Sequence, residues 1–287
     1  MIKIEPLGTS TAKLVYSDNC QDILSLSVAE TMEIFKSSGL ILFRGFGVTN
    51  KQFKIFAEQF SSEFVRDDLR PIVDSFDGVI HVVDEGMGYV APHCEGATSP
   101  LRPDVIWFRC EVPPAQDGET LFWDGVQVWS ELSEAVKQLF RANQTKFVHH
   151  ISVENWKDFL GDNATIADLK RTLDDFEGVN YIIKDDQSVY MEYLCSAVIK
   201  TRYGNYDAFA NGIINEHRVR KVIFEDDSPI PDTVIDEINE VIDRLTGMIS
   251  WQSGDLVMID NSRFLHGRRA FNDSRRKIFF ANSILNF

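Results

Sequence analysis

Two stretches decide the fold, YVAPHCE at residues 89–95 and DNSRFLHGR at residues 260–268. Alternate residues of an extended segment point to one face, so His93 and Glu95 are expected to project together while Cys94 turns into the opposite layer. His266 lies in the second stretch and can complete a three-ligand metal site with them. Because these residues are far apart in the chain, the fold must bring distant segments into one sheet.

Strand-like segments at both ends of the chain predict the fold class. They fall at residues 40–46, 79–83, 105–108, 120–123, 249–251, 256–259 and 277–285. Strands early and late, with irregular material between them, predict an antiparallel β core that distant segments complete and helices cover. The predicted class is mainly β with α: a double-stranded β-helix, the jelly roll of the cupins, flanked by helices.

Helical patterns lie between and around these strands. They are expected at residues 23–36, after a capping box formed by Thr49 and Gln52, at residues 126–140 and at residues 232–245. No linker rich in proline, glycine or serine divides the chain, so residues 1–287 are expected to form one domain. Residues 143–227 give no clean period, and a loop region of this length is expected to be an insertion that covers the functional site.

The composition excludes several classes of function. The net charge is −15, from 29 basic and 44 acidic residues, which opposes binding to nucleic acid or to anionic membranes. The four cysteines show no C-x-x-C spacing and do not indicate a disulfide framework. No leader peptide is visible, and no segment approaches the roughly 18 apolar residues of a membrane span. We expect a cytoplasmic protein; the sequence leaves its oligomeric state open.

His93, Glu95 and His266 have the ligand chemistry of a non-haem iron centre. Two histidines and one carboxylate around an octahedral ion leave neighbouring positions open, the arrangement that non-haem Fe(II) oxygenases use. We expect His266 in a loop that follows the strand at residues 256–259. The same ligands also suit Mn(II) or Zn(II). In the alternative interpretation, His93 and Glu95 form a surface ion pair and His266 is a packed core histidine.

Further motifs accompany this trio. The segment DGETLFWD at residues 117–124 follows the His-x-Glu pair by about one hairpin, and Arg275 and Arg276 follow His266. The strand LILFRGF at residues 40–46 precedes a Phe-rich helix, and GDL at residues 254–256 precedes DNSR. In their order and spacing, these motifs resemble the taurine dioxygenase and clavaminate synthase superfamily of Fe(II)/2-oxoglutarate-dependent oxygenases. The resemblance covers most of the chain.

This resemblance implies roles for individual positions. The iron ligands, which form the catalytic centre, correspond to His93, Glu95 and His266. Thr120 corresponds to the threonine whose hydroxyl helps hold the distal carboxylate of 2-oxoglutarate, and Arg276 to the arginine that pairs with it. A guanidinium offers a planar two-donor fork that matches a carboxylate. Arg275 is the alternative to Arg276, because adjacent strand residues face opposite ways.

The implied cofactors are Fe(II), 2-oxoglutarate as cosubstrate, and dioxygen. The implied reaction oxidises an unactivated C–H bond of a small molecule, while 2-oxoglutarate is converted to succinate and CO2. Hydroxylation, desaturation and cyclisation remain open, because substrate placement decides among them. Glu95 stands where taurine dioxygenases usually carry aspartate and clavaminate synthase carries glutamate, which favours an amino acid or its derivative as substrate. Phe280 stands where the superfamily often has a second arginine. A halogenase is disfavoured because those relatives lose the carboxylate ligand.

Two other functions remain as alternatives. A cupin-like metalloenzyme, such as an isomerase or hydrolase, would use the same three ligands without 2-oxoglutarate; Thr120 and Arg276 argue against it. A β-sandwich binding protein would have structural histidines and would purify without metal.

The remaining chemically suggestive residues are expected to have mostly structural roles. Core packing is expected for His81, Trp107 and Trp123, solvated or capping roles for His149 and His150, a turn for Asp260 and Asn261, and ion pairs for Arg268 and Arg269. Tyr89 is expected to line the substrate pocket or to pack. Gly204 is a candidate hinge, with Tyr203 and Tyr206 beside it as candidate substrate contacts.

Overall fold

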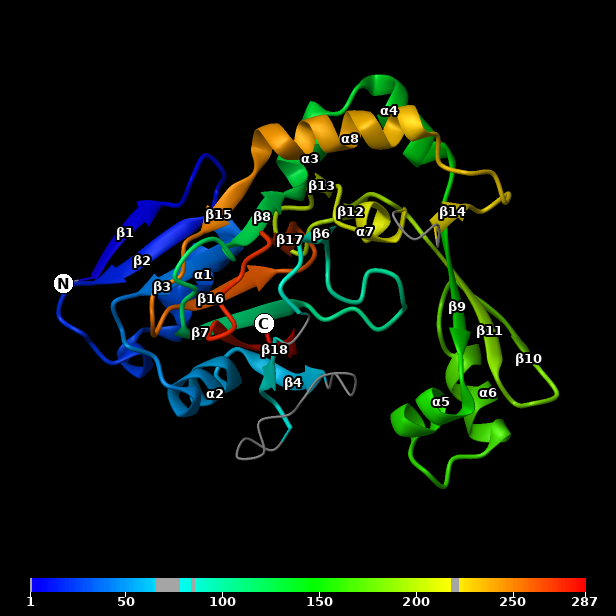
Figure 1. Cartoon of the computed structure of the whole chain (residues 1–287), viewed down its shortest axis with the longest axis horizontal. Helices are drawn as coiled ribbons and strands as arrows, with labels where there is room; N and C mark the ends of the chain where they lie inside the picture. Colours follow the sequence, from blue (N-terminus) through cyan, green and yellow to red (C-terminus); the bar gives the residue numbers. More distant parts are fainter. Residues whose placement is uncertain (1, 66–77, 84–85, 218–221) are drawn as a thin grey trace.

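The computed structural model describes residues 2–65, 78–83, 86–217 and 222–287, and two sheets lie at its centre (Figure 1). The larger sheet has the order β1-β2-β3-β16-β7-β18-β4, with β5 also paired to β18, and the smaller has the order β15-β8-β17-β6. The larger sheet comprises β1 (Ile2–Pro6), β2 (Lys13–Ser17), β3 (Leu40–Arg44), β4 (Ser61–Val65), β5 (His81–Val82), β7 (Val105–Val112), β16 (Leu256–Asp260) and β18 (Lys277–Leu285). The smaller comprises β6 (Val90–His93), β8 (Thr120–Asp124), β15 (Gly247–Ile249) and β17 (Phe264–Arg268).

One apolar layer holds the two sheets against each other. It is built from Leu42, Phe108 and Val257 of the larger sheet and from Phe122 and Phe264 of the smaller sheet, among others. Within the smaller sheet, β17 pairs with β6, so the segment that carries His93 and the segment that carries His266 are neighbours.

Strand β7 shows how one segment serves two layers. Val105 and Trp107 pack into the cluster beneath the helices of the larger sheet, whereas Ile106 and Phe108 point between the sheets. This alternation is the two-residue period of a strand that is buried on both faces.

Helices cover the outer face of each sheet. Over the larger sheet lie α1 (Val28–Ser38) and α2 (Asn50–Glu58), and over the smaller sheet lie α3 (Gly125–Glu131), α4 (Glu134–Ala142) and α8 (Asp232–Leu245). The predicted capping box is confirmed, because Gln52 N donates to Thr49 Oγ1 and the Gln52 side chain accepts from Thr49 N. No helix among the described residues has both the length and the apolar character that a bilayer crossing requires.

A second structural unit fills the region expected to be an insertion. Its sheet has the order β10-β11-β9-β14 and packs against two helices through a small apolar cluster (Figure 1, right side). Its elements are β9 (Thr145–Ile151), α5 (Val153–Leu160), α6 (Ile166–Asp174), β10 (Val179–Ile183), β11 (Val189–Cys195) and β14 (Val222–Phe224). The other elements of the region lie apart from this unit: β12 (Ile199–Lys200) pairs with β13 (Asp207–Ala208) as a separate sheet, and Ala208 and the helix α7 (Ile213–His217) pack into the core cluster of the smaller central sheet. The part of the insertion at residues 218–221 lies outside the described residues.

Three predictions about local structure are wrong in detail. The single helix expected at residues 126–140 is two helices, because Ser133 caps α4 by accepting from Val136 N. The helix expected from residue 23 is a 3-10 turn, Ile23–Ser25, followed by α1 behind its own cap, Ser27. The core is not wholly antiparallel, since β2 and β3 pair in parallel.

A buried ion pair ties the smaller sheet to the stretch that leads to His266. Arg263 Nε and Nη2 donate to the two carboxylate oxygens of Asp124 at 3.0 and 2.7 Å, and both side chains are buried. Asp124 Oδ1 also accepts from Val126 N at the start of α3.

Arg263→Ala should lower the free energy of unfolding by about 3–5 kcal/mol, because it leaves the Asp124 carboxylate buried without its cation. Urea denaturation measures this change. The matched control is Arg171→Ala, which removes the exposed pair with Asp168 and should cost less than about 1 kcal/mol. Equal effects of the two substitutions would contradict the prediction.

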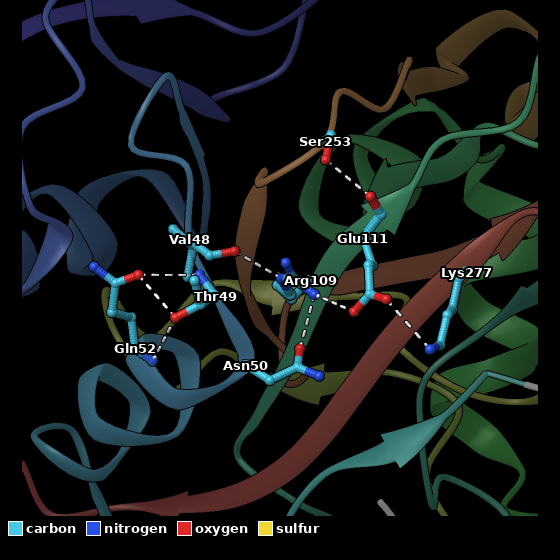
Figure 2. A network of polar contacts seen from close by, with 8 residues as sticks. All are labelled: Val48, Thr49, Asn50, Gln52, Arg109, Glu111, Ser253 and Lys277. Atoms are coloured by element: carbon cyan, nitrogen blue, oxygen red, sulfur yellow. Dashed lines mark hydrogen bonds and ion pairs between the residues drawn. The ribbon is translucent and has the colours of Figure 1, made fainter.

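Figure 2 shows a polar network at the start of α2. Arg109 on β7 donates to Val48 O, Asn50 Oδ1 and Glu111 Oε2 at 2.8–2.9 Å. Glu111 in turn contacts Lys277 at 3.3 Å. The network joins β7, α2 and β18, and none of its residues lines the pockets described below.

Candidate metal centre

His93 and His266 face each other across two paired strands. His93 ends β6, His266 is the middle residue of β17, and the two are direct partners in the antiparallel register. Their ring centroids lie 4.3 Å apart. The expectation that His266 follows a strand in a loop is wrong, because the chain turns at residues 261–263 and re-enters the smaller sheet as β17 before it reaches His266.

Glu95 joins the two histidines from just beyond the end of β6. Ligand atoms of His93, Glu95 and His266 all lie within 4.8 Å of one another, and His266 Nε2 is 3.8 Å from Glu95 Oε2. A metal ion about 2.1 Å from each ligand spans at most about 4 Å between two of them. The contact between His266 and Glu95 therefore fits a single ion.

The tautomer of His93 is also suited to metal binding. His93 Nδ1 lies 2.9 Å from the carbonyl oxygen of Ala91. A carbonyl only accepts, so this contact favours the neutral tautomer with the proton on Nδ1, in which Nε2 has a lone pair for a metal.

One pocket is lined by all five residues expected in the site: His93, Glu95, Thr120, His266 and Arg276. The pairing of β17 with β8 explains part of this arrangement, because it sets Thr120 opposite Arg268, two residues beyond His266. Thr120 Oγ1 accepts a hydrogen bond from Trp251 Nε1 at 3.1 Å. The hydroxyl proton of Thr120 is therefore left to donate to another acceptor.

The two adjacent arginines differ in their surroundings. Arg276 lines the pocket, donates from Nε to Gly118 O at 3.1 Å and lies over the ring of Phe271. Arg275 is exposed and pairs through Nε and Nη2 with Asp273 at 2.9 Å. Burial, together with the nearby positive charge of Arg268, lowers the pKa of Arg276 to about 10. The Arg276 guanidinium thus stays charged at neutral pH.

Arg268 is a pocket residue that the sequence reasoning assigned to a structural ion pair. It is buried and lines the same pocket as Arg276. Like Arg276, it lies over the ring of Phe271. The signal that could have found it is simple: Arg268 lies two residues after His266, and alternate residues of a strand share a face. Two arginines therefore line the pocket that contains the candidate metal ligands.

A second pocket shares Val90, His93 and Glu95 with the first. Its other lining residues include Tyr89, Thr98, Asn215 and Glu216, so it is polar and continuous with two of the three candidate ligands. Tyr89, expected either to line the substrate pocket or to pack, is exposed and lines this second pocket.

Comparison with known families bears on this geometry. A family model described as taurine catabolism dioxygenase TauD, TfdA family, matches residues 3–281. The chain belongs to the TauD/TfdA family. It is a non-haem oxygenase that depends on Fe(II) and 2-oxoglutarate, and the cluster of His93, Glu95 and His266 has the donor set that such an iron ion requires.

Curated relatives of this TauD/TfdA protein are distant but nearly full-length. It is 22% identical over 272 residues to the dapdiamide synthesis protein DdaC of Enterobacter agglomerans, covering 85% of this chain and 82% of the relative. It is 23% identical over 286 residues to 3-((Z)-2-isocyanoethenyl)-1H-indole synthase of Fischerella ambigua, covering 96% of this chain and 92% of the relative.

The solved structure of PvcB from Pseudomonas aeruginosa has a similar fold. It matches with a TM-score of 0.66 at 14% identity, covering 99% of this chain and 91% of PvcB. Another structure of PvcB describes it as an Fe, alpha-ketoglutarate-dependent oxygenase from an isonitrile synthetic pathway. At this identity the likeness shows that the sheet-rich architecture of the TauD/TfdA protein is that of known oxygenases.

Most residues set aside as structural in this TauD/TfdA protein are indeed away from the pockets. His81, Trp107 and Trp123 are buried as predicted. The candidate substrate contacts are not supported, because Tyr203 packs edge-on against Phe35 and Tyr206 is exposed; neither lines a described pocket.

Proposed function

We propose that His93, Glu95 and His266 bind Fe(II), that Thr120 and Arg276 bind the distal carboxylate of 2-oxoglutarate, and that the enzyme oxidises an unactivated C–H bond of a small molecule. The observation that carries this proposal is that one pocket is lined by all five side chains. A cupin-like isomerase or hydrolase would need the three metal ligands but would have no use for the buried Thr120 hydroxyl and the half-buried Arg276 guanidinium beside them.

Each of the two cosubstrate residues has a defined task. Arg276 presents a charged fork, oriented by its bond to Gly118 O and by the ring of Phe271, and a carboxylate matches that fork. Thr120 Oγ1 already accepts a hydrogen bond from Trp251 Nε1. Its hydroxyl proton is therefore available to donate to the same carboxylate. Fe(II) bound by these residues would activate dioxygen, the oxidant, which would take two electrons from 2-oxoglutarate, giving succinate and CO2, and two from the substrate. The protein orients the reactants and excludes water.

The substrate that we propose is an amino acid or an amino-acid derivative. Glutamate rather than aspartate at position 95 resembles clavaminate synthase in this respect. The second pocket adds polar groups, among them Thr98, Asn215 and Glu216, next to two candidate ligands. The names of the two curated relatives describe nitrogen-containing small molecules, which is in keeping with such a substrate.

We propose that the chain is a single domain with a double-stranded β-helix core and that residues 143–227 cover the site. Two facing sheets formed from early and late strands support the core assignment. For the cover, His149 on β9 places Nε2 at 2.6 Å from Thr98 O, and Thr98 lines the second pocket. The insertion thus contacts the rim of the proposed substrate site.

The wild-type protein should bind Fe(II) and 2-oxoglutarate together in the absence of oxygen. Anaerobic titration should produce a visible absorption band that needs both components, and admitting air should release succinate. A small-molecule panel followed by mass spectrometry should then yield a product that has gained one oxygen or lost two hydrogens. Absence of the band, or turnover that is independent of 2-oxoglutarate, would favour the cupin-like alternative.

A further inference from the structure

The acidic candidate ligand lies outside the regular sheet. Strand β6 ends at His93, and Glu95 begins a turn that continues through Gly96, whose φ is +64°. Strand pairing therefore fixes His93 and His266 but does not reach Glu95. A glutamate side chain has one more rotatable bond than aspartate, so the position of its carboxylate depends strongly on how its main chain is held.

The amide of Asn261 holds that main chain at both polar atoms. Glu95 N donates to Asn261 Oδ1 at 3.0 Å, and Asn261 Nδ2 donates back to Glu95 O at 2.8 Å. The same Nδ2 donates to Pro103 O at 2.8 Å. Asn261 therefore satisfies the Glu95 main chain as a neighbouring strand would.

Asn261 is itself rigidly placed. It is fully buried, its main-chain N donates to Asp104 O at 3.0 Å, and Arg102 donates to its carbonyl oxygen. Asp260, one residue earlier, makes the expected turn by accepting from Ser262 N and Oγ. The two residues therefore have separate roles, although both were expected to serve the turn.

We propose that Asn261 is a positioning residue for the metal centre, acting through Glu95. The segment at residues 260–268 then supplies the ligand His266 and also positions the ligand Glu95, which follows β6. This inference rests on the proposed role of Glu95 as a ligand. Removing the amide should free the Glu95 main chain and weaken metal binding by about 10- to 100-fold, the range found when hydrogen-bond partners of metal ligands are lost.

A double-mutant cycle with Zn(II) as the probe tests this inference. Zn(II) binds imidazole well, so affinity stays measurable when Glu95 is absent. Dissociation constants are measured for the wild type, Asn261→Ala, Glu95→Ala and the double variant. If Asn261 acts through Glu95, Asn261→Ala should weaken binding about 10- to 100-fold with Glu95 present and less than about 2-fold in the Glu95→Ala background. The same loss in both backgrounds would overturn the inference.

Asn211→Ala is the matched control for lost buried hydrogen bonds. Asn211 is also buried, and its side chain donates to Ala197 O and accepts from Ile213 N. Only its main-chain carbonyl reaches the segment of the candidate ligands, where it accepts from Cys94 N at 3.0 Å, and the substitution leaves that main-chain bond in place. It should lower the melting temperature while leaving the Zn(II) dissociation constant within about 2-fold. Should Asn261→Ala not fold, Asn261→Ser, whose short hydroxyl cannot span both atoms of Glu95, takes its place. If the wild type binds Fe(II) and 2-oxoglutarate but the effects of Asn261→Ala and Glu95→Ala on Zn(II) binding simply add, this inference is refuted while the proposed function stands.

Discussion

Glu95→Ala should abolish succinate release in the presence of Fe(II), 2-oxoglutarate and air. The carboxylate lies 3.8 Å from His266 Nε2, and its loss leaves two histidines to hold the metal. Metal affinity should fall by more than about 100-fold, the most that loss of an outer hydrogen-bond partner of a metal ligand costs. Metal content after gel filtration and succinate release by mass spectrometry measure the two effects.

The control for this variant is Glu111→Ala. Glu111 is also a paired carboxylate, held by Arg109 and Lys277 (Figure 2), but it lines neither pocket. It should retain wild-type metal content and succinate release. Full activity in Glu95→Ala would show that Glu95 is not a ligand, and equal losses in both variants would point to a general folding defect.

Local signals predicted the elements that depend on neighbouring residues alone. The helix Asp232–Leu245 and the strand Lys277–Leu285 have the bounds that the sequence predicted, because apolar period and end signals both lie within the segment. The break between α3 and α4 was missed although Ser133 is a good cap. The apolar period runs through the break, so the period alone predicts one continuous helix.

Long-range pairing was less accessible. Alternation placed His93 and Glu95 on one face, but β6 ends at His93 and a turn carries Glu95. His93, Glu95 and His266 still lie together, because Asn261, which is distant in the sequence, holds the main chain of Glu95 by two hydrogen bonds. No hydrophobic period in the sequence predicts that contact, because it forms where two turns from distant parts of the chain lie side by side. The parallel pairing of β2 with β3 is also a long-range contact, and no strand at residues 13–17 is predicted from the sequence.

The surroundings of Arg275 and Arg276 support Arg276 as the proposed cosubstrate anchor, a choice that strand alternation leaves open. The two residues precede β18. The alternation of apolar residues within that strand does not fix which way the side chains before it point. The pairing of Arg275 with Asp273 directs one guanidinium to solvent, while Arg276 lies over Phe271 in the pocket. This difference provides a matched pair of variants.

Arg276→Ala should weaken 2-oxoglutarate binding by about 2–5 kcal/mol, the cost of removing one partner from a buried, hydrogen-bonded charge pair. This corresponds to roughly a 30- to 4000-fold rise in the dissociation constant. Anaerobic titration of the Fe(II)-loaded protein with 2-oxoglutarate measures it. Fe(II) affinity without 2-oxoglutarate should stay near the wild-type value, because Arg276 is not among the three clustered candidate ligands.

Arg275→Ala removes the same side chain one residue away and should leave 2-oxoglutarate affinity within about 2-fold of wild type. Arg276→Lys should fall between the two, since an ammonium keeps the charge but loses the planar fork. The order Arg275→Ala, Arg276→Lys, Arg276→Ala would thus separate charge from geometry. Unchanged affinity in Arg276→Ala would move the cosubstrate anchor elsewhere, and the buried Arg268, which shares Phe271 with Arg276, would then be the residue to test.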